Sequence, residues 1–378
     1  MFIPRIINLA EIIEKKSYFL FGPRQTGKST LIREQLQGVP VYNLLDGPTL
    51  LRLSRSPTRL REEIRPEQKV AVIDEIQKLP SLLDEVHYLI EERNMRFLLT
   101  GSSARKLRQG GVNLLGGRAR SQTLHPLLCS ELGDQFDLLK ALNHGLIPSL
   151  YFSDSPQEDL ESYASNYLKE EIMAEGLTRN IPAFSRFLEV AALCNGKLIN
   201  YTEIGNDAQV PRTTVHEYFQ ILKDTLIAYE LPPWKKSKTR KPISTSKFYF
   251  FDGGVARFLQ NRSLIQERSP EFGDAFETYF FHELKTFVDY TKCGELHYWR
   301  STSGFEVDFI LGDSTAIEIK AKSTISRQEL KGLLALREEK KLKQYFLISR
   351  EDHPRTVEGI QLLPWNLFLK KLWGREVI

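Results

Sequence analysis

The residues with the clearest chemical potential form the run FGPRQTGKST, residues 21–30. Its Gly22, Gly27, Lys28 and Ser29 fit the spacing G-x-x-x-x-G-K-[ST], which is typical of loops that hold nucleoside triphosphates. Glycines let backbone N–H groups curl around phosphate oxygens, the lysine reaches the β and γ phosphates, and the serine hydroxyl is placed to bind Mg²⁺. We therefore predict a site for ATP and Mg²⁺ whose binding loop comprises Gly22, Pro23, Arg24, Gln25, Thr26, Gly27, Lys28, Ser29 and Thr30.

Two acids follow the next apolar run, KVAVIDEIQKLP. Its first part predicts a buried parallel strand over residues 70–73, and Asp74 and Glu75 stand at the carboxyl end, where ligands of open α/β sheets bind. We expect Asp74 to hold Mg²⁺ through water and Glu75 to polarise the attacking water, a role that separates hydrolysis from nucleotide binding alone. The alternative is a strand that ends in two solvated acids.

The elements around these residues predict an α/β fold. SYFLF before the loop indicates a buried strand, and STLIREQL after it has the apolar spacing of a helix, which gives the strand, loop and helix order that the motif requires. RFLLTGSSARKL supplies another strand over residues 97–99, followed by Thr100, Gly101, Ser102 and Ser103. A polar side chain at that position is able to touch the γ-phosphate or the attacking water.

The runs FGPRQTGKST, VIDEIQKLP, LLTGSSARKL and LLGGRARSQTLHPL resemble prokaryotic AAA-type ATPases that carry a C-terminal domain of unknown function. The resemblance extends over almost the whole chain. It implies a Walker A loop at residues 22–29, Walker B acids at Asp74 and Glu75, and a sensor-like Ser102 or Ser103. It also implies an arginine finger in GGRAR that reaches a γ-phosphate. Arg118 is the preferred candidate for this finger, and Arg120 is the second. A finger acting on a neighbouring subunit would require a homo-oligomer, and the alternative is an arginine in a surface loop.

The final third of the chain carries a second group of acids. GDAFETYFFHELKTF predicts an amphipathic helix with Glu277, GELHYWRSTSGFEVDFIL predicts two strands of which the second carries Asp308, and STAIEIKAK predicts a strand with Glu318 and Lys320. Residues i and i+2 of a strand share a face, and an adjacent strand can bring Asp308 beside them. Asp308 and Glu318 are hard oxygen ligands suited to Mg²⁺, while Lys320 could orient water or offset phosphate charge.

These four positions resemble the core of the PD-(D/E)XK nuclease superfamily, with Glu277 as the acid of the first helix. The resemblance implies a restriction-endonuclease-like α/β domain in which Glu277, Asp308, Glu318 and Lys320 serve catalysis. The alternative is a nuclease-like fold with idle acids, or with the acids in an ion-pair cluster.

Between these regions, LINYTEIGNDAQVPRTTVHEYFQILKDTLIAYEL predicts a helix-turn-helix. A short helix begins near Thr202, a turn holds Pro211, a longer helix spans about 212–222, and strands like those of a wing follow. The second helix is expected to expose groups that can meet phosphates or bases: Arg212, Thr213, Thr214, His216 and Gln220. The basic segment 235–241, expected at the wing tip, could contact a DNA backbone. The alternative is a winged helix used only for packing between domains.

Composition limits these interpretations. The chain has 378 residues, 41% hydrophobic and 26% charged, with a net charge of +4, which fits a soluble globular protein of two or three domains. Its three cysteines lack metal-site spacing, and no apolar run reaches the length of a membrane span, so we expect a cytoplasmic protein. We predict an AAA-type ATPase domain at 1–130, a helical connector at 131–180, a winged helix at 181–250 and a nuclease-like domain at 251–378.

Two functions from different classes compete. The first is an ATP-driven, DNA-processing enzyme in which nucleotide state changes how the winged helix and the nuclease-like domain meet DNA. The second is a nucleotide-dependent regulatory module that recognises a protein partner, with an inactive nuclease-like domain. The basic segment and the four-residue cluster favour the first, whereas the modest net charge favours the second.

Overall fold

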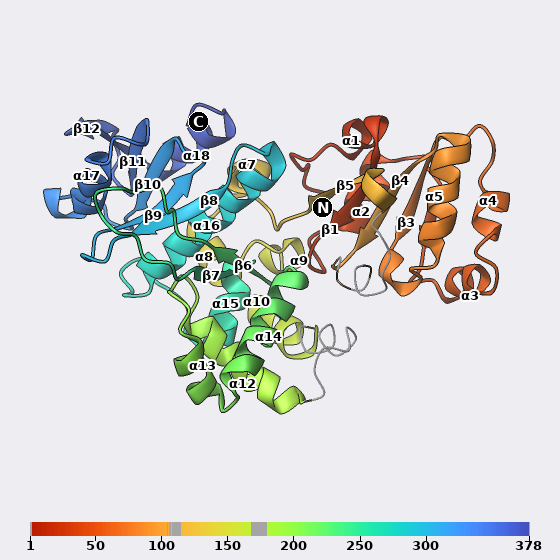
Figure 1. Cartoon of the computed structure of the whole chain (residues 1–378), viewed down its shortest axis with the longest axis horizontal. Coiled ribbons are helices and arrows are strands. Elements are labelled where there is room, and N and C mark those ends of the chain that lie inside the picture. Colours follow the sequence, from red (N-terminus) through yellow and green to blue (C-terminus); the bar gives the residue numbers. More distant parts are fainter. Residues whose placement is uncertain (1, 104, 106, 108–114, 168–179, 378) are drawn as a thin grey trace. The chain divides into compact units, whose positions relative to one another are not determined.

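The computed structural model describes residues 2–103, 105, 107, 115–167 and 180–377. The chain forms two compact units, one of Met1–Leu127 with Asp224–Ile227 and one of Leu128–Lys223 with Ala228–Ile378 (Figure 1). Residues 168–179 of the predicted helical connector, and Ala104 and Lys106 of the run LLTGSSARKL, lie outside the described residues. No described helix is long and apolar enough to cross a membrane.

The first unit contains a parallel five-stranded sheet in the order β2-β3-β4-β1-β5. The predicted strands around residues 17–21, 70–73 and 97–99 are confirmed. The strands are β1 (Ser17–Phe21), β2 (Val41–Asn43), β3 (Val70–Asp74), β4 (Arg96–Gly101) and β5 (Ala119–Thr123). The helices are α1 (Leu9–Lys15), α2 (Lys28–Gln35), α3 (Gly47–Arg55), α4 (Arg59–Glu63) and α5 (Leu82–Arg93), with 3₁₀ turns η1 (Ile76–Lys78) and η2 (Leu115–Gly117).

Burial explains why these segments are nearly continuous apolar runs. A parallel sheet is covered on both faces, so successive strand residues face one apolar layer or the other. Phe19, Ile73, Phe97 and Leu99 all lie in one buried cluster, and α5 contributes Val86 to it. The polar residues after β1, β3 and β4 are thereby brought to the same, carboxyl edge of the sheet.

The second unit begins with helices. They are α7 (Cys129–Leu132), α8 (Leu138–His144), α9 (Pro148–Tyr151), α10 (Pro156–Glu161), α12 (Ile181–Leu193), α13 (Tyr201–Ala208), α14 (Arg212–Asp224) and α15 (Gly253–Leu259), with a 3₁₀ turn η3 (Gly133–Gln135) and a π-helical turn η4 (Ser162–Tyr167). Strands β6 (Ala228–Leu231) and β7 (Lys247–Phe250) form an antiparallel pair after α14. Phe187, Tyr218, Phe219 and Phe248 pack edge to face or tilted, which joins α12, α14 and β7 into one aromatic core.

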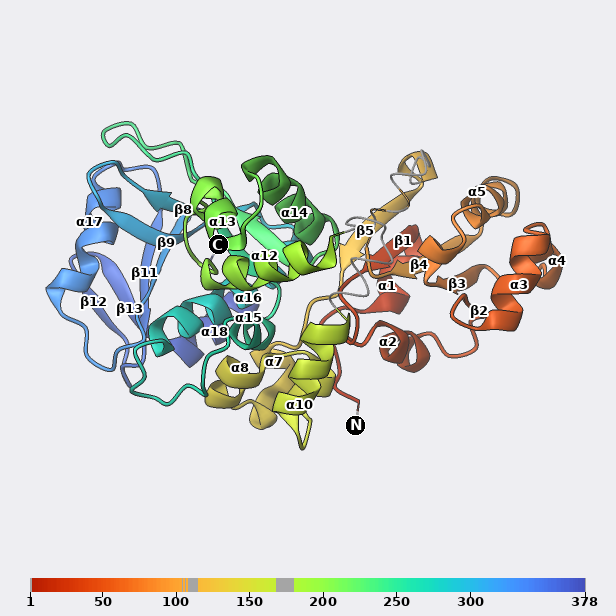
Figure 2. The same cartoon turned by 90° about the horizontal axis from the view of Figure 1, so that it is seen from below.

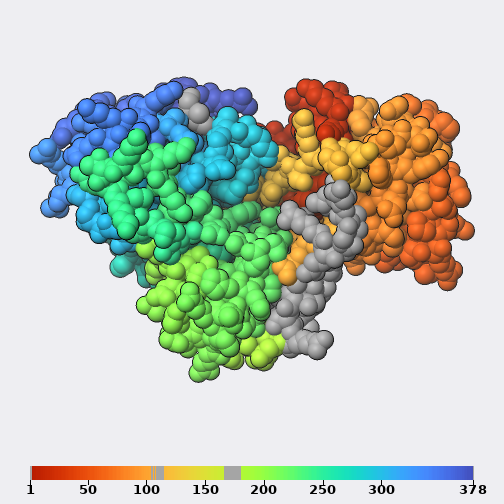
Figure 3. Space-filling view, in the orientation of Figure 1, coloured from red at the N-terminus to blue at the C-terminus, as the bar shows by residue number. Residues whose placement is uncertain are grey.

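The β6–β7 connection carries the basic segment 235–241, but it is not a free wing tip. The Glu339 carboxylate accepts hydrogen bonds from the backbone N–H groups of Lys238, Thr239 and Arg240 at 2.8–2.9 Å. Trp234 N–H donates to Tyr298 O at 2.7 Å. The basic segment thus lies in the connection between the two strands, and this acid fixes its backbone. Figures 1 and 2 show the connection beside the C-terminal sheet, and Figure 3 shows its green atoms on the surface.

The C-terminal part of the second unit is built on a mixed six-stranded sheet in the order β12-β13-β11-β10-β9-β8. The predicted helix and three strands around residues 272–320 are confirmed. The strands are β8 (Leu296–Arg300), β9 (Glu306–Leu311), β10 (Thr315–Ile319), β11 (Gln344–Ser349), β12 (Arg355–Val357) and β13 (Ile360–Pro364). The helices are α16 (Phe272–Thr291), α17 (Lys331–Arg337) and α18 (Trp365–Trp373), with a 3₁₀ turn η5 (Arg327–Leu330).

Candidate functional site

The phosphate-loop sequence forms the turn between β1 and α2. Gly27 caps α2 with a φ of 95°, a left-handed conformation that suits glycine. The Lys28 side chain is buried, and its Nζ donates to Gly22 O at 2.6 Å and to Pro23 O at 3.0 Å. The lysine ammonium therefore already points into the mouth of the loop, where a phosphate would replace the two carbonyls as its partner.

The first strand-end acid meets the loop directly. Ser29 Oγ donates to Asp74 Oδ2 at 3.0 Å, and the Thr100 hydroxyl donates to the other oxygen of Asp74. Asp74 is 4% exposed. A hydroxyl beside a buried carboxylate is the oxygen donor set that Mg²⁺ takes in phosphate-loop proteins, so these residues fit the ion.

Glu75 follows in a strained conformation, with a φ of 63° and a ψ of 45°. Its N–H donates to Thr100 Oγ1 at 3.2 Å, and its carboxylate accepts a hydrogen bond from Gln77 Nε2. Gln77 Nε2 also lies 3.4 Å from Ser102 Oγ, so this amide links the acid of β3 to the serine after β4. Sequence reasoning gave Gln77 no role, although its place one turn beyond the strand end was the available signal.

Arg118 lies far from the phosphate loop within its own unit. It precedes Ala119, which pairs with Ser17 at the start of β1, whereas the loop follows the end of β1. Its Nε forms an ion pair with Glu91 of α5. Arg120 lies on β5 beside Tyr18 and is exposed. Neither arginine is therefore close to a nucleotide bound in the same chain.

Arg5 supports the phosphate loop in a way that the sequence did not indicate. Its Nη1 donates to Thr26 O at 2.9 Å, and its Nη2 donates to His125 O at 2.6 Å and to Pro126 O at 3.1 Å. The guanidinium thus joins the loop to the segment after β5. The sequence gives no signal for this contact because the partners are main-chain carbonyls.

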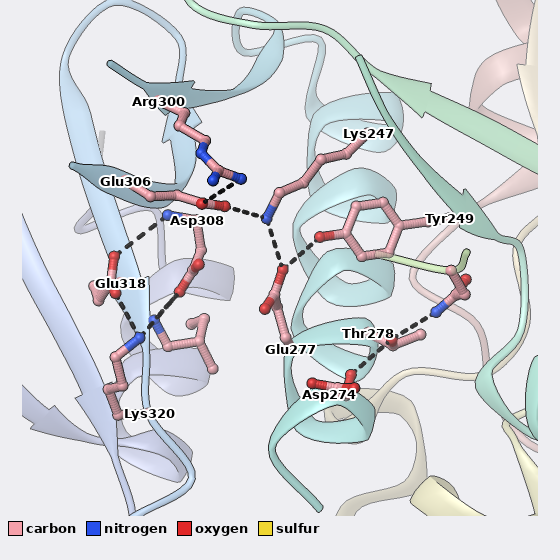
Figure 4. Close-up of polar contacts among 12 residues, drawn as sticks. Lys247, Tyr249, Asp274, Glu277, Thr278, Arg300, Glu306, Asp308, Glu318 and Lys320 are labelled. Atoms are coloured by element: carbon pink, nitrogen blue, oxygen red, sulfur yellow. Dashed lines mark hydrogen bonds and ion pairs between the residues drawn. The ribbon is translucent and has the colours of Figure 1, made fainter. Parts of the chain in front are cut away.

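The two acids of the C-terminal sheet stand opposite each other. The antiparallel register pairs Ile317 with Phe309, so the next positions are Glu318 and Asp308, which are 7% and 6% exposed. Lys320 Nζ lies 2.5 Å from Glu318 Oε1 and 3.9 Å from Asp308 Oδ2. Ile319 N–H also donates to Asp308 Oδ2 at 2.8 Å. The structure therefore brings together Asp308 of β9, Glu318 of β10 and Lys320 just after β10, which the sequence singled out (Figure 4).

Glu277 of α16 reaches this region from the helix, but its direct partners come from β7. Its Oε1 accepts hydrogen bonds from Tyr249 OH at 2.6 Å and from Lys247 Nζ at 3.2 Å. Lys247 Nζ also lies 2.8 Å from Glu306 Oε1, at the start of β9. Sequence reasoning missed both β7 residues because they lie about thirty positions before Glu277.

The charges of this cluster perturb one another. Burial, and then the nearby carboxylate of Asp308, raises the pKa of Glu318 to about 8 against the opposing effect of Lys320. Burial and Asp308 also raise the pKa of Glu277, whereas Lys247 and Tyr249 oppose that rise. For Lys320, burial disfavours the ammonium, but Asp308 and Glu318 outweigh it and raise the pKa. Burial first, and then the nearby carboxylate of Asp308, thus favours the protonated forms of Glu318 and Glu277.

The described residues hold no group of three or more His, Cys, Asp and Glu side chains arranged around a common metal position. Asp308 and Glu318 offer two carboxylates that lie beside the same ammonium. Mg²⁺ is commonly held by one or two carboxylates, with water completing its octahedral shell. These residues therefore fit a divalent ion held by two acids and water, and do not form an all-protein cage.

The second helix of the predicted helix-turn-helix shows its polar side chains to solvent. Arg212, Thr213, His216 and Gln220 are exposed, and Thr214 is half-buried. The His216 ring stacks on Tyr201 of α13, with ring centroids 3.6 Å apart.

Three family models match successive parts of the chain. Residues 14–133 match an AAA domain. They include the phosphate loop and the whole five-stranded sheet of the first unit, and end in the first residues of the second unit. Residues 135–265 match a domain of unknown function (DUF8612), and residues 272–368 match another domain of unknown function (DUF4143).

Two mycobacterial proteins are similar along most of the chain. The uncharacterized protein Rv2008c of Mycobacterium tuberculosis is 27% identical over 334 residues, which cover 84% of this chain and 73% of the relative. The uncharacterized protein Mb2031c of Mycobacterium bovis gives the same values.

Solved structures give weaker likenesses. The replication initiator DnaA bound to AMPPCP and single-stranded DNA has a TM-score of 0.31 and 14% identity, covering 59% of this chain and 90% of that one. The Orc1 protein of Aeropyrum pernix in complex with DNA has a TM-score of 0.27 and 13% identity, covering 69% and 94%. TM-scores this low do not establish a shared fold.

Proposed function

We propose that this chain is a Mg²⁺-dependent ATPase whose nucleotide state controls DNA binding or processing by its second unit. The observation that carries the ATPase is the 3.0 Å hydrogen bond from Ser29 Oγ to Asp74 Oδ2, which joins the phosphate loop to the first strand-end acid. The match of residues 14–133 to an AAA domain supports the same reaction.

Each side chain of the proposed nucleotide site has a distinct role. Lys28 binds the β and γ phosphates, and Ser29 and Asp74 hold Mg²⁺, which offsets the phosphate charge when bound. Glu75 orients the attacking water, because its carboxylate is fixed by Gln77 at the carboxyl edge of the sheet. Ser102 is the sensor-like residue beside Gln77.

The middle of the chain supplies the DNA contacts in this proposal. Helices α13 and α14 followed by the antiparallel β6–β7 pair support a winged helix, with Arg212, Thr213 and His216 exposed. Four lysines of the basic segment are also exposed, namely Lys235, Lys236, Lys238 and Lys241. Their backbone is fixed by Glu339, so the charges are presented without a large loss of loop entropy on binding.

The C-terminal sheet supplies a phosphodiesterase site in this proposal. Asp308 and Glu318 would hold a divalent ion, which activates water and stabilises negative charge on the scissile phosphate. Lys320, 2.5 Å from Glu318, is placed to offset the same charge, and Glu277 adds a carboxylate from α16. The mixed sheet with these acids on neighbouring strands supports the nuclease-like assignment.

A filter-binding titration of the full chain with duplex DNA tests the coupling. We expect affinity to differ between ATP and ADP and to fall steeply between 50 and about 200 mM salt. Replacing Lys235, Lys236, Lys238 and Lys241 by alanine should weaken binding and lower the salt slope. Alanine at Lys370 and Lys371 of α18 is the control for lost surface charge. If the filter retained the same amount of DNA with ATP and with ADP, and salt did not change that amount, the DNA proposal would be overturned.

One observation favours a second function, a nucleotide-dependent module that binds a protein partner. The acids of the C-terminal sheet are already ion-paired, Glu318 with Lys320 and Glu277 with Lys247. Such pairing, of Glu318 on β10 and of Glu277 on α16, would suit an inactive nuclease-like fold. Nucleotide hydrolysis without any DNA retention would support this second function over the first.

A further inference from the structure

Acidic side chains of α16 and β9 form a charge network with the hairpin of β6 and β7. Lys247 and Tyr249 are residues i and i+2 of β7, so their side chains leave the same face of the strand. Figure 4 shows both reaching toward Glu277 on α16. The Lys247 side chain is 5% exposed, and Tyr249 is fully buried.

Lys247 links the helix to the sheet. Its Nζ lies 3.2 Å from Glu277 Oε1 on α16 and 2.8 Å from Glu306 Oε1 on β9. Glu306 in turn lies 3.5 Å from Arg300 Nη1 on β8. A buried ammonium persists only where carboxylates compensate its desolvation, so this lysine fixes the separation of the two acids that bind it.

Tyr249 fixes the orientation of one of these acids. Its hydroxyl donates to Glu277 Oε1 at 2.6 Å, on the same oxygen that binds Lys247. Its ring stacks on Phe281, one turn further along α16, with ring centroids 4.0 Å apart. Both donors engage a single oxygen, and in the described part of the chain the second oxygen of Glu277 accepts no hydrogen bond. One carboxylate oxygen is thus held by two donors, and the other is open to solvent, since the Glu277 side chain is 24% exposed.

We propose that Lys247 and Tyr249 are positioning residues of the C-terminal acid site, holding Glu277 so that its second oxygen accepts a hydrogen bond from a metal-bound water beside Asp308 and Glu318. This inference rests on the proposed metal-dependent site. Its consequence is that the site is built from two segments, β7 and the C-terminal sheet with its helix. Movement of the β6–β7 hairpin would thereby change the geometry of the acids.

The test measures Mn²⁺ binding to the full chain by calorimetry without nucleotide, counting only the binding that Asp308→Ala removes. Tyr249→Phe keeps the stacked ring and deletes only the hydroxyl, so we expect Mn²⁺ affinity to fall about tenfold. In Lys247→Met, the Mn²⁺ affinity should fall further than in Tyr249→Phe. In Lys247→Arg, most of the wild-type affinity should be retained. The matched control is Tyr345→Phe, which deletes another buried hydroxyl, 3.4 Å from Leu342 O.

A kinetic readout separates positioning from general loosening of the fold. For DNA cleavage by the same proteins, Tyr249→Phe should lower kcat and leave KM for DNA within about twofold of the wild type. Wild-type Mn²⁺ affinity in both Tyr249→Phe and Lys247→Met would overturn the positioning role and leave the metal site standing. If the wild type shows no Mn²⁺ binding that Asp308→Ala removes, the proposed metal site and this inference both fail.

Discussion

Arg118 and Lys28 lie at opposite ends of the strand pair β1–β5. Ala119 pairs with Ser17 at the start of β1, while Lys28 follows the loop that leaves its end, so β1 separates them by roughly 15 Å at about 3.3 Å per residue. An arginine finger at Arg118 therefore cannot serve the nucleotide of its own chain without refolding the sheet. If Arg118 acts in catalysis, it acts on a neighbouring subunit.

This geometry predicts complementation between two inactive variants. Arg118→Ala and Lys28→Ala chains should each lose ATP hydrolysis, the first by about 10³-fold if it is a true finger. An equimolar mixture should recover activity, because some interfaces then combine an intact loop with an intact arginine. The measurement is steady-state phosphate release at protein concentrations where the chains associate, checked by light scattering.

Glu91 provides the control for a purely structural arginine. It is the ion-pair partner of Arg118, and the pair is about half exposed, so its net contribution to stability is small. Glu91→Ala should leave hydrolysis within about twofold of the wild type. If Glu91→Ala and Arg118→Ala reduce activity equally, and the mixture recovers nothing, the arginine serves only this surface pair.

Lys28→Ala and Glu75→Gln should fail in different ways. The first removes the ammonium that already points into the loop, so ATP affinity should fall about tenfold to hundredfold. The second keeps the shape of the side chain and removes only its negative charge, so ATP should bind normally while kcat falls about 10²- to 10⁴-fold. Binding of a fluorescent ATP analogue and phosphate release distinguish the two, and normal turnover in Glu75→Gln would remove Glu75 from its role.

Gln77 should affect turnover through Glu75. Its amide donates to the Glu75 carboxylate and lies 3.4 Å from Ser102 Oγ. Gln77→Ala frees the acid to rotate, so we expect kcat to fall about threefold to tenfold, the worth of one hydrogen bond, with KM for ATP nearly constant. An unchanged kcat, in protein with wild-type thermal stability, would show that Glu75 is held by its strained backbone alone.

Local pattern was enough to predict the elements that carry the chemistry. The phosphate-loop spacing and the two strand-end acids follow from rules that act within a few residues, and the structure joins Ser29 to Asp74 as that order requires. Alternation along β10 and the residue after it likewise sufficed to predict that Glu318 and Lys320 lie side by side.

Contacts between distant segments could not be predicted in this way. Lys247 reaches Glu277 and Glu306 from a different hairpin, and Glu339 holds a loop about one hundred positions earlier in the chain. A single sequence gives the residue types at these positions but no distances between them. The sequence therefore could not show that three backbone N–H groups of the basic segment bind the one carboxylate of Glu339.

Asp308 and Glu318 should be separable from ATP hydrolysis. Both lie in the second unit, whereas the phosphate loop lies in the first, so alanine at either position should abolish metal-dependent DNA cleavage and leave phosphate release within about twofold. The assay uses duplex, single-stranded and branched DNA with Mg²⁺ or Mn²⁺ and ATP. A wild-type protein that cuts none of these substrates would contradict the nuclease assignment.

The buried carboxyl group of Glu283 leads us to predict that the second unit loses stability as pH rises. It is fully buried on α16, and burial raises its pKa to about 7, although hydrogen bonds from Cys129 N–H, Tyr279 OH and Trp373 Nε1 oppose the rise. The folded chain thus holds this proton more tightly than the unfolded chain, whose glutamate titrates near its ordinary 4.5. The contribution of Glu283 to the free energy of unfolding is therefore fully present below pH 4.5 and is lost as the pH rises to about 7.

The measurement is urea unfolding followed by circular dichroism at several pH values from 4.5 to 8. The slope has an upper limit of about 1.4 kcal/mol per pH unit for one group, and Asp252, whose pKa burial raises to about 6, adds in the same direction. Glu283→Gln loses the bond from Trp373 and should be less stable throughout, but its slope should be flatter because it cannot titrate. Trp373→Phe removes a hydrogen-bond donor that favours the ionised carboxylate, so the pKa of Glu283 should rise. The stability of this variant should therefore keep falling to a higher pH than that of the wild type. Equal slopes in the wild type and Glu283→Gln would show that Glu283 titrates alike in the folded and unfolded chain.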